Sequence, residues 1–319
     1  MQTIQRLTIS IPNFYTTPES MALLKGIAEH VDVNTGPRPS PEQLTHYLEE
    51  TDALIIGIKE YIYPDVFPSK LRTRWLGTLS IGVDHIDLDA CEERGLQVIN
   101  TPAANASSVA EYTIASMLSM VKKMWTCNKA VREGTKRKGV HPFPRDLSAM
   151  TVGLLGAGPI AYKVARWLTA MDVTVKAWTY RPDAHQEFDA LGVRWVESPE
   201  ELCRQVNILS VHLPATPKTK GMIDLPFLNH RAQRPFYLVN TSRADLIAPQ
   251  TIKQALAQDL LDAVALDVFH DEDRLEDLPV ERCLLSPHLA GVTTDSLARM
   301  SVALAERLVA QIRQDLQRP

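Results

Sequence analysis

The chain has 319 residues, of which 45% are hydrophobic and 23% are charged. This length and composition favour two globular domains with ordinary cores and exclude disordered and collagen-like proteins. Thirty-four Lys and Arg against 38 Asp and Glu leave a net charge of -4, which provides no broad positive field for nucleic acid or an anionic membrane. We therefore expect neither as a partner.

The N-terminus lacks the apolar core of a signal peptide, and no stretch reaches the ~20 apolar residues that span a bilayer. The four cysteines, Cys91, Cys127, Cys203 and Cys283, are far apart and form no CxxC pair. We therefore predict a cytoplasmic protein with reduced cysteines and no metal site.

Short apolar runs alternate with amphipathic segments over the first hundred residues. The pattern predicts strands at 7–11, 31–34, 53–57, 76–81 and 97–101, and helices at 18–30, 41–50 and 88–94. A second series of strands follows at 151–155, 173–178, 208–212, 236–240, 263–267 and 283–286. Alternation of this kind predicts parallel βαβ units, so we expect an α/β protein with two doubly wound parallel-sheet domains.

Two further helices are predicted outside the alternating series. One spans about 107–134 and connects the domains, and the other spans 293–316 and returns to the first domain. The first predicted domain is thus 1–103 with 292–319, and the second is 104–291. Between helix and strand, residues 136–145 form a basic, proline-containing loop, which is either a solvated connector or a subunit contact.

The strongest local motif follows the apolar run at 151–155. Gly156, Gly158 and Ala161 occupy the positions of a G-x-G-x-x-G/A dinucleotide motif between a strand and a helix. The first glycine permits the tight turn, the second lets the backbone approach a pyrophosphate, and the small third residue lets helix and strand pack closely. Pro159 suits the first helical turn, where its missing donor is not needed.

The next strand ends without the acidic residue that usually binds the adenosine ribose of NAD. Thr179 stands at that position, and Arg181 follows two residues later. Loss of the carboxylate removes repulsion of a 2′-phosphate, and an arginine can bind that phosphate through two parallel hydrogen bonds. The pattern favours NADP(H) as the cofactor, with NAD(H) as the alternative. Arg181 could also be an ordinary surface arginine that binds no cofactor.

Arg243, Glu272 and His288 each follow a strand of the second series, at the sheet edge where open α/β sheets bind ligands. Arg243 is suited to bind a substrate carboxylate and to polarise its carbonyl group. His288 is suited to exchange a proton with the oxygen, and a hydrogen bond from Glu272 would favour its protonated form. Taken singly, His288 could be structural and Glu272 could belong to an acidic surface run, but together the three indicate carbonyl chemistry.

Several motifs together resemble the D-isomer-specific 2-hydroxyacid dehydrogenase family over nearly the whole chain. They are Ser80-Ile-Gly-Val-Asp-His-Ile-Asp87, Ser108-Val-Ala-Glu111, Val211-His-Leu-Pro-Ala-Thr-Pro217, Asn240-Thr-Ser-Arg243, Ala265-Leu-Asp-Val-Phe269 and Ser286-Pro-His-Leu-Ala-Gly291. The resemblance is to the glyoxylate and hydroxypyruvate reductases of that family.

The resemblance implies a Rossmann dinucleotide-binding domain inserted in a flavodoxin-like substrate domain, and a homodimer. It assigns catalysis to Arg243, Glu272 and His288, and a position near the nicotinamide carboxamide to Asp267. The expected cofactor-binding residues are Gly156, Gly158, Pro159, Ile160, Thr179, Tyr180, Arg181, Leu213, Pro214, Thr241 and Asp267. Two positions depart from the family pattern: Ala244 replaces the usual Gly after Arg243, and Asp273 replaces the usual Pro after Glu272.

The predicted function is hydride transfer between a nicotinamide cofactor and a small 2-keto or D-2-hydroxy acid. We expect the substrate carboxylate to bind Arg243 and the backbone near Gly82 and Val83, with Lys59 available for a second acidic or polar group or else solvated. The alternative is a dinucleotide-sensing interaction protein of the corepressor type, a branch of the same family with the same fold.

Overall fold

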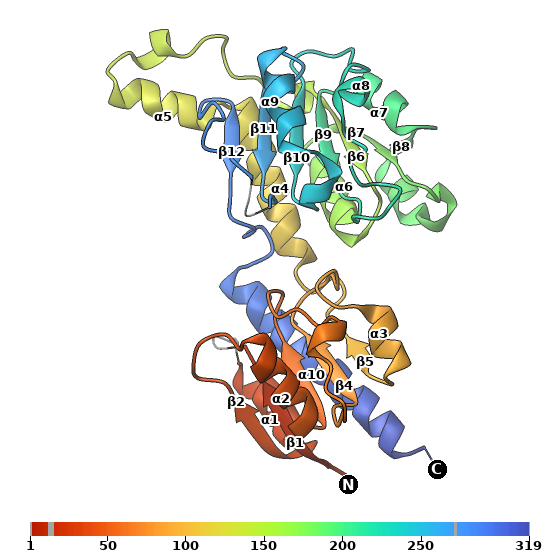
Figure 1. Ribbon diagram of the computed structural model, residues 1–319. Coiled ribbons are helices and arrows are strands. Elements are labelled where there is room, and N and C mark those ends of the chain that lie inside the picture. Colours follow the sequence, from red (N-terminus) through yellow and green to blue (C-terminus); the bar gives the residue numbers. More distant parts are fainter. Residues whose placement is uncertain (1, 12–15, 271–272, 319) are drawn as a thin grey trace. The chain divides into compact units, whose positions relative to one another are not determined.

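The computed structural model describes residues 2–11, 16–270 and 273–318, and the chain divides into two compact units (Figure 1). Unit 1 comprises Met1–Asn105 and Thr293–Pro319, and unit 2 comprises Ala106–Val292. Each unit contains one sheet, and every strand pair of both sheets is parallel. The predicted fold class, two parallel-sheet α/β domains, is confirmed.

The sheet of unit 1 has the strand order β2-β1-β3-β4-β5, which is the doubly wound order of flavodoxin-like domains. The strands are β1 Ile4–Ile9, β2 Ala28–Val33, β3 Ala53–Ile56, β4 Trp75–Thr78 and β5 Gln97–Ile99. The helices are α1 Pro18–Lys25, α2 Pro41–Glu50, α3 Leu88–Glu93 and α10 Thr294–Leu316, with a 3-10 turn η1 at Pro64–Val66.

Helix α10 packs on the sheet of unit 1 although 194 residues separate it from β5. Its apolar stripe, including Leu304, Leu308 and Ile312, shares one buried cluster with Leu7 and Ile55 of the strands. Near the end of the helix, Trp75 Nε1 donates a hydrogen bond to the carboxylate of Asp315 at 2.9 Å. The C-terminal helix is therefore an integral part of unit 1.

The sheet of unit 2 has the order β12-β11-β10-β9-β6-β7-β8. Counted from β6, this is the Rossmann order, with its switch point between β6 and β9. The strands are β6 Thr151–Leu155, β7 Thr174–Trp178, β8 Arg194–Trp195, β9 Ile208–Val211, β10 Tyr237–Asn240, β11 Ala263–Leu266 and β12 Cys283–Leu285. The central strands are buried along their whole length, as expected for a parallel sheet covered on both faces.

Helices and short turns cover this sheet. The helices are α4 Ala106–Val121, α5 Met124–Arg132, α6 Pro159–Ala170, α7 Pro199–Gln205, α8 Leu225–Leu228 and α9 Pro249–Ala257. The 3-10 turns are η2 Lys136–Gly139, η3 Leu147–Ala149, η4 Pro182–Ala184, η5 Gln186–Leu191 and η6 Ala244–Leu246.

Three details of the predicted elements are wrong. The helix predicted over 18–30 ends at Lys25, because Gly26 caps it and the following residues pair with β1. The helix predicted over 107–134 breaks at Lys123, which has a left-handed backbone with φ of +51°, so that α4 and α5 are separate helices. The two-residue strand β8 at the sheet edge was not predicted.

Candidate active site

The glycine loop after β6 has the geometry that the motif requires. Gly156 has φ of +113°, and a Cβ there would lie 2.6 Å from the carbonyl oxygen of His212, so a larger residue is excluded by both conformation and space. At Gly158, by contrast, a Cβ would meet nothing within 4 Å. The loop thus leaves open space beside Gly158, where a pyrophosphate can approach the backbone.

Helix α6 begins directly after this loop, with Gly158 as its N-cap and Pro159 and Ile160 in its first turn. No side chain caps this N-terminus among the residues that the structure describes. Free N–H groups and the positive end of the helix dipole suit an anion. The loop and helix therefore fit the pyrophosphate of a dinucleotide.

Two neighbouring loops at the same sheet edge are tied together by hydrogen bonds. The carbonyl oxygen of Leu213, after β9, accepts a hydrogen bond from Ser242 Oγ, after β10. The carbonyl oxygen of Pro214 accepts one from Thr219 Oγ1 at 2.6 Å. Thr241 Oγ1 lies 3.1 Å from Thr113 Oγ1 of α4. Hydrogen bonds thus fix the loops that contain the predicted cofactor residues Leu213, Pro214 and Thr241 at this edge of the sheet.

His212 lies at the end of β9 and is a further polar residue of this edge that the sequence analysis did not assign. Its Nε2 lies 2.9 Å from Ser210 Oγ. Burial lowers the pKa of His212 from 6.5 to about 4, because the charged imidazolium would lose its hydration. The side chain is therefore neutral in the folded protein at neutral pH.

Because of this depressed pKa, the free energy of unfolding depends on pH. The unfolded chain takes up a proton on His212 below about pH 6.5, whereas the folded chain takes it up only near pH 4, so acid favours unfolding within this window. We expect His212→Gln to remove about 2 kcal/mol of the stability loss between pH 7 and pH 5. Urea unfolding at both pH values measures this difference. The exposed His46 on α2, changed to Gln, is the control. Equal losses of stability between pH 7 and pH 5 in wild type and His212→Gln would show that the pKa of His212 is not depressed.

Thr179, Tyr180 and Arg181 follow β7, at the same carboxyl edge. Tyr180 is 55% exposed, and its ring meets the edge of Trp178 with centroids 4.7 Å apart. A cavity of about 450 Å³ opens here, lined by Trp178, Thr179, Tyr180, Pro182, Trp195, Val196 and Glu197. Arg181 is exposed and precedes η4. The guanidinium is accessible to a ligand beside this cavity.

Arg243 follows β10 in a loop that the buried Asn240 shapes. Asn240 Oδ1 accepts a hydrogen bond from the Ser242 backbone N–H at 3.0 Å, and its Nδ2 donates to the Arg243 carbonyl oxygen at 2.9 Å. Arg243 Nη1 donates to the Ser242 carbonyl oxygen at 2.9 Å. Ala244, where the family has Gly, begins the 3-10 turn η6 and has no positive φ. Alanine is therefore accommodated at this position.

His288 follows β12 in a loop wrapped around Asp267. Asp267, at the end of β11, is 1% exposed, and its carboxylate accepts hydrogen bonds from Ser286 Oγ, Leu289 N and Ala290 N at 2.6, 2.9 and 2.9 Å. His288 has φ of +56°, a left-handed conformation that costs a non-glycine residue about 1–3 kcal/mol. Ser286 is a polar residue of the site that sequence reasoning missed.

Glu272, the third predicted catalytic residue, lies outside the described residues. Next to it, Asp273 replaces the usual Pro, and its Oδ2 accepts a hydrogen bond from the His270 backbone N–H at 2.7 Å. The Asp273 backbone N–H donates in turn to the His270 carbonyl oxygen at 3.0 Å. A proline at position 273 would have neither the carboxylate nor the backbone N–H that make these two hydrogen bonds.

In unit 1, Gly82 and Val83 lie in the loop after β4. Ser80 Oγ donates to the Gly82 carbonyl oxygen at 2.6 Å, and Thr78 Oγ1 lies 2.9 Å from Ser80 Oγ and 2.9 Å from His85 Nε2. This chain of buried polar groups fixes the loop from inside. The carbonyl group of Gly82 is therefore held in place by Ser80.

Lys59 lies in the loop after β3, next to β4 in the sheet of unit 1. The buried Glu60 stabilises this loop through two hydrogen bonds. Its Oε2 accepts one from the Gly57 N–H at 2.7 Å, and its Oε1 accepts one from Arg38 Nε at 3.0 Å. Lys59 is exposed, and the nearby rings of Tyr61 and Tyr63 stack with centroids 5.9 Å apart. The loop thus carries an exposed cation and, two and four residues further on, two stacked phenol rings.

The structure brings most of the predicted residues of unit 2 to one edge of one sheet. Gly156, Thr179, Leu213, Thr241, Arg243, Asp267 and His288 follow β6, β7, β9, β10, β11 or β12. Lys59, Gly82 and Val83 follow β3 and β4 of unit 1. Within the described ranges no group of three or more His, Cys, Asp or Glu side chains is arranged to hold a metal ion, and no helix there is long and apolar enough to cross a membrane.

A Rossmann-ordered sheet with this glycine loop defines a class of proteins, the dinucleotide-binding α/β proteins. Comparison with known proteins narrows the class. The family model "D-isomer specific 2-hydroxyacid dehydrogenase, NAD binding domain" matches residues 114–290. A glyoxylate reductase of Aeropyrum pernix is 30% identical over 305 residues, covering 92% of this chain and 89% of that protein.

Solved structures share the fold over nearly the whole chain. A D-lactate dehydrogenase of Aquifex aeolicus, complexed with NAD and lactic acid, has a TM-score of 0.82 at 24% identity and covers 98% of this chain and 97% of its own. An acyclic imino acid reductase in complex with NADPH and D-Arg has a TM-score of 0.87 at 20% identity and covers 97% and 98%.

The chain belongs to the D-isomer-specific 2-hydroxyacid dehydrogenase family. It is an oxidoreductase that transfers hydride between a nicotinamide cofactor and 2-keto or 2-hydroxy acids. The predicted family and enzyme class are confirmed, and no finding favours the corepressor alternative.

Proposed function

We propose that the enzyme reduces small 2-keto acids to D-2-hydroxy acids, with NADP(H) preferred over NAD(H). The observation that carries the proposal is the set of strand-end residues Arg243, Asp267 and His288 on the sheet edge that also bears the glycine loop. The bound nicotinamide supplies the hydride. The side chains of this edge bind the acid and move the proton.

The three proposed catalytic residues have different tasks. Arg243 binds the substrate carboxylate with its planar fork of donors and polarises the neighbouring carbonyl. His288 gives a proton to the carbonyl oxygen during reduction and takes it back during oxidation. Glu272 favours the protonated imidazole. The backbone of Gly82 and Val83 is proposed to bind the substrate carboxylate as well.

A panel of 2-keto acids, assayed with purified protein and either NADPH or NADH, tests this function. We expect turnover of glyoxylate and of at least one larger keto acid. Among the larger acids we expect those with a second acidic or polar substituent to be favoured, because Lys59 and the two tyrosines offer a cation and hydroxyl groups. The glyoxylate reductase relative supports the small substrate. Failure to reduce any member with either cofactor would refute the proposal.

The cofactor preference is supported by Thr179 and Arg181. A charge-assisted pair between Arg181 and a 2′-phosphate is worth about 1.5–3 kcal/mol, or one to two powers of ten in discrimination. We expect Arg181→Ala to raise KM for NADPH by about 10–100-fold while leaving KM for NADH nearly unchanged. The exposed Arg166 of α6, changed to Ala, is the control. Equal kcat/KM for NADH and NADPH in wild type would contradict the preference.

A homodimer is the proposed assembly, with a second copy docking on the surface formed by α5 and the loop that follows it. Met124, Val131 and Phe143 are 58%, 69% and 61% exposed on this surface. The helix is anchored on its own unit, because Trp125 Nε1 donates to the Glu281 carbonyl oxygen at 2.6 Å and Lys129 Nζ lies 2.5 Å from Glu281 Oε1. Exposed apolar side chains on a fixed helix are typical of a subunit interface.

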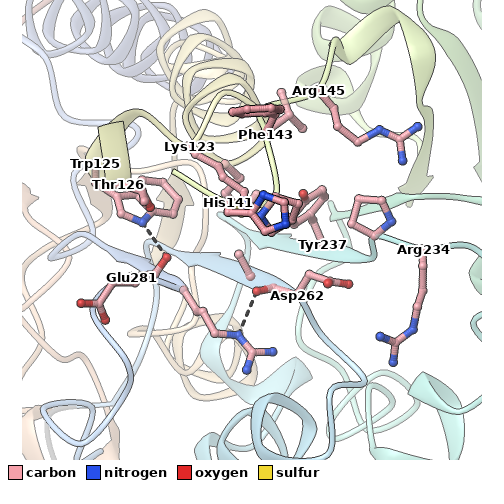
Figure 2. Close-up of a pocket in the computed structure, with 16 residues that line it drawn as sticks. Lys123, Trp125, Thr126, His141, Phe143, Arg145, Arg234, Tyr237, Asp262 and Glu281 are labelled. Carbon is pink, nitrogen blue, oxygen red and sulfur yellow. Dashed lines mark hydrogen bonds between the residues drawn. The ribbon is translucent and has the colours of Figure 1, made fainter. Parts of the chain in front are cut away.

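Charge and shape support a second copy as the occupant of this surface. Residues 122–145 hold eight Lys and Arg against one Glu, so the rest of the chain, with 26 Lys and Arg and 37 Asp and Glu, has a net charge of -11. Beside α5 lies a cavity of about 560 Å³, with Lys123, His141 and Tyr237 in its lining (Figure 2). A basic, hollowed surface is complementary to the acidic remainder of another copy.

Light scattering on the purified protein tests the dimer. We expect a mass near twice 35.6 kDa for wild type, and a shift toward the single-chain mass for Val131→Glu. Met171→Glu, at a partly exposed apolar residue after α6, is the control. A wild-type mass of one chain would refute the dimer.

A cytoplasmic location is proposed as well, and the four free cysteines support it. Burial raises the pKa of Cys91 to about 11 and that of Cys203 to about 12, which keeps both side chains as unreactive thiols.

A further inference from the structure

We propose that Ser286, acting through the carboxylate of Asp267, positions His288 for proton transfer. The inference rests on the proposed role of His288, and it assigns to Ser286 and Asp267 a task separate from cofactor binding. Ser286 is a positioning residue in this account, because its hydroxyl binds another protein side chain.

Asp267 organises the whole loop that carries His288. Its carboxylate accepts hydrogen bonds from residues on both sides of His288: Ser286 Oγ at 2.6 Å, Leu289 N at 2.9 Å and Ala290 N at 2.9 Å. Its main chain takes part too, since the His288 N–H donates to the Asp267 carbonyl oxygen at 2.8 Å. The strand β11 is buried along its whole length, so this arrangement attaches the loop to the interior of the sheet.

The hydrogen bonds to Asp267 stabilise the backbone conformation of His288. A φ of +56° is a left-handed conformation that few non-glycine residues adopt and that the surroundings must stabilise. The bonds from Leu289 and Ala290 to the carboxylate impose it here, because they hold the chain directly after His288. The direction in which the imidazole leaves the backbone therefore depends on the orientation of the Asp267 carboxylate.

Ser286 fixes that orientation. Its hydroxyl donates to Oδ1, the same oxygen that accepts from Leu289 N, and an O–H bond to a carboxylate at 2.6 Å is short and charge-assisted. A carboxylate has about four acceptor positions, and the loop uses three of them. Ser286 is the residue to test, because Asp267 is also a proposed cofactor residue and its replacement would mix two effects.

The experiment compares Ser286→Ala and Ser286→Thr in steady-state reduction of glyoxylate with NADPH. We expect Ser286→Ala to lower kcat by about 3–30-fold, since small misplacements of a catalytic group are costly, with KM for NADPH unchanged. Ser286→Thr keeps a hydroxyl at the same position and should retain most of the activity. Ser301→Ala removes a buried hydroxyl that donates to Ser20 Oγ at 2.8 Å in unit 1 and controls for general destabilisation.

A double-mutant cycle separates positioning from a merely structural role. If Ser286 acts through His288, the Ser286→Ala change should have no further effect on the residual rate of a His288→Ala protein. An equal loss in both backgrounds, or an unchanged kcat in Ser286→Ala alone, would overturn the inference. A wild-type enzyme that reduces no keto acid would instead refute the proposed function.

Discussion

His288→Ala is expected to lower kcat for keto acid reduction by about 10²–10⁴-fold, the range typical for loss of a general acid. The cofactor residues of the glycine loop are untouched, so KM for NADPH should change little. The loop itself should survive, because Leu289 N, Ala290 N and Ser286 Oγ hold Asp267 without the imidazole.

A second variant guards against a backbone effect. Asparagine tolerates a positive φ better than alanine does, so His288→Asn preserves the left-handed conformation while removing the proton donor. Both variants should show the same loss of kcat, and His230→Ala, at an exposed histidine after α8, should show none. Retention of wild-type turnover by His288→Asn would remove His288 from the mechanism.

Arg243→Lys is expected to lower kcat/KM for the keto acid by about 10²–10³-fold. The planar guanidinium offers two parallel donors to a carboxylate, whereas an ammonium is a point charge that cannot reproduce this fork. Part of the loss should fall on KM and part on kcat, because the same group is proposed to bind the carboxylate and polarise the carbonyl.

Steady-state kinetics with glyoxylate measure this effect, and Arg204→Lys, at an exposed arginine on α7, is the control. The loop should remain in place, since Asn240 holds it through the backbone of Ser242 and Arg243. Identical kinetics for Arg243→Lys and wild type would mean that the arginine does not touch the substrate.

The strand pattern and the glycine loop could be predicted from sequence because both are local signals. Buried parallel strands appear as continuous apolar runs, and the turn at Gly156 needs a residue that accepts a φ of +113°. The start of β2 could not be predicted in the same way. Residues 28–30 continue a helical pattern, and their pairing with β1 is a contact between segments distant in sequence.

The environment of the candidate site was less accessible to sequence reasoning. The sequence places His288 after a strand, but the left-handed backbone and the bonds to Asp267 depend on the neighbouring strand β11. Ser286 belongs to one of the sequence motifs, but the role of its hydroxyl follows only from the 2.6 Å distance between Ser286 Oγ and Asp267 Oδ1. Likewise, the burial that depresses the pKa of His212 comes from packing around the switch point.

The configuration of the product tests the central claim most directly. Pyruvate or hydroxypyruvate is incubated with the enzyme and NADPH, and the hydroxy acid formed is resolved by chiral chromatography. Hydride delivery to a keto acid held in one orientation, as proposed for Arg243 and His288, predicts the D-2-hydroxy acid alone. Formation of the L-isomer or of a racemate would contradict the account.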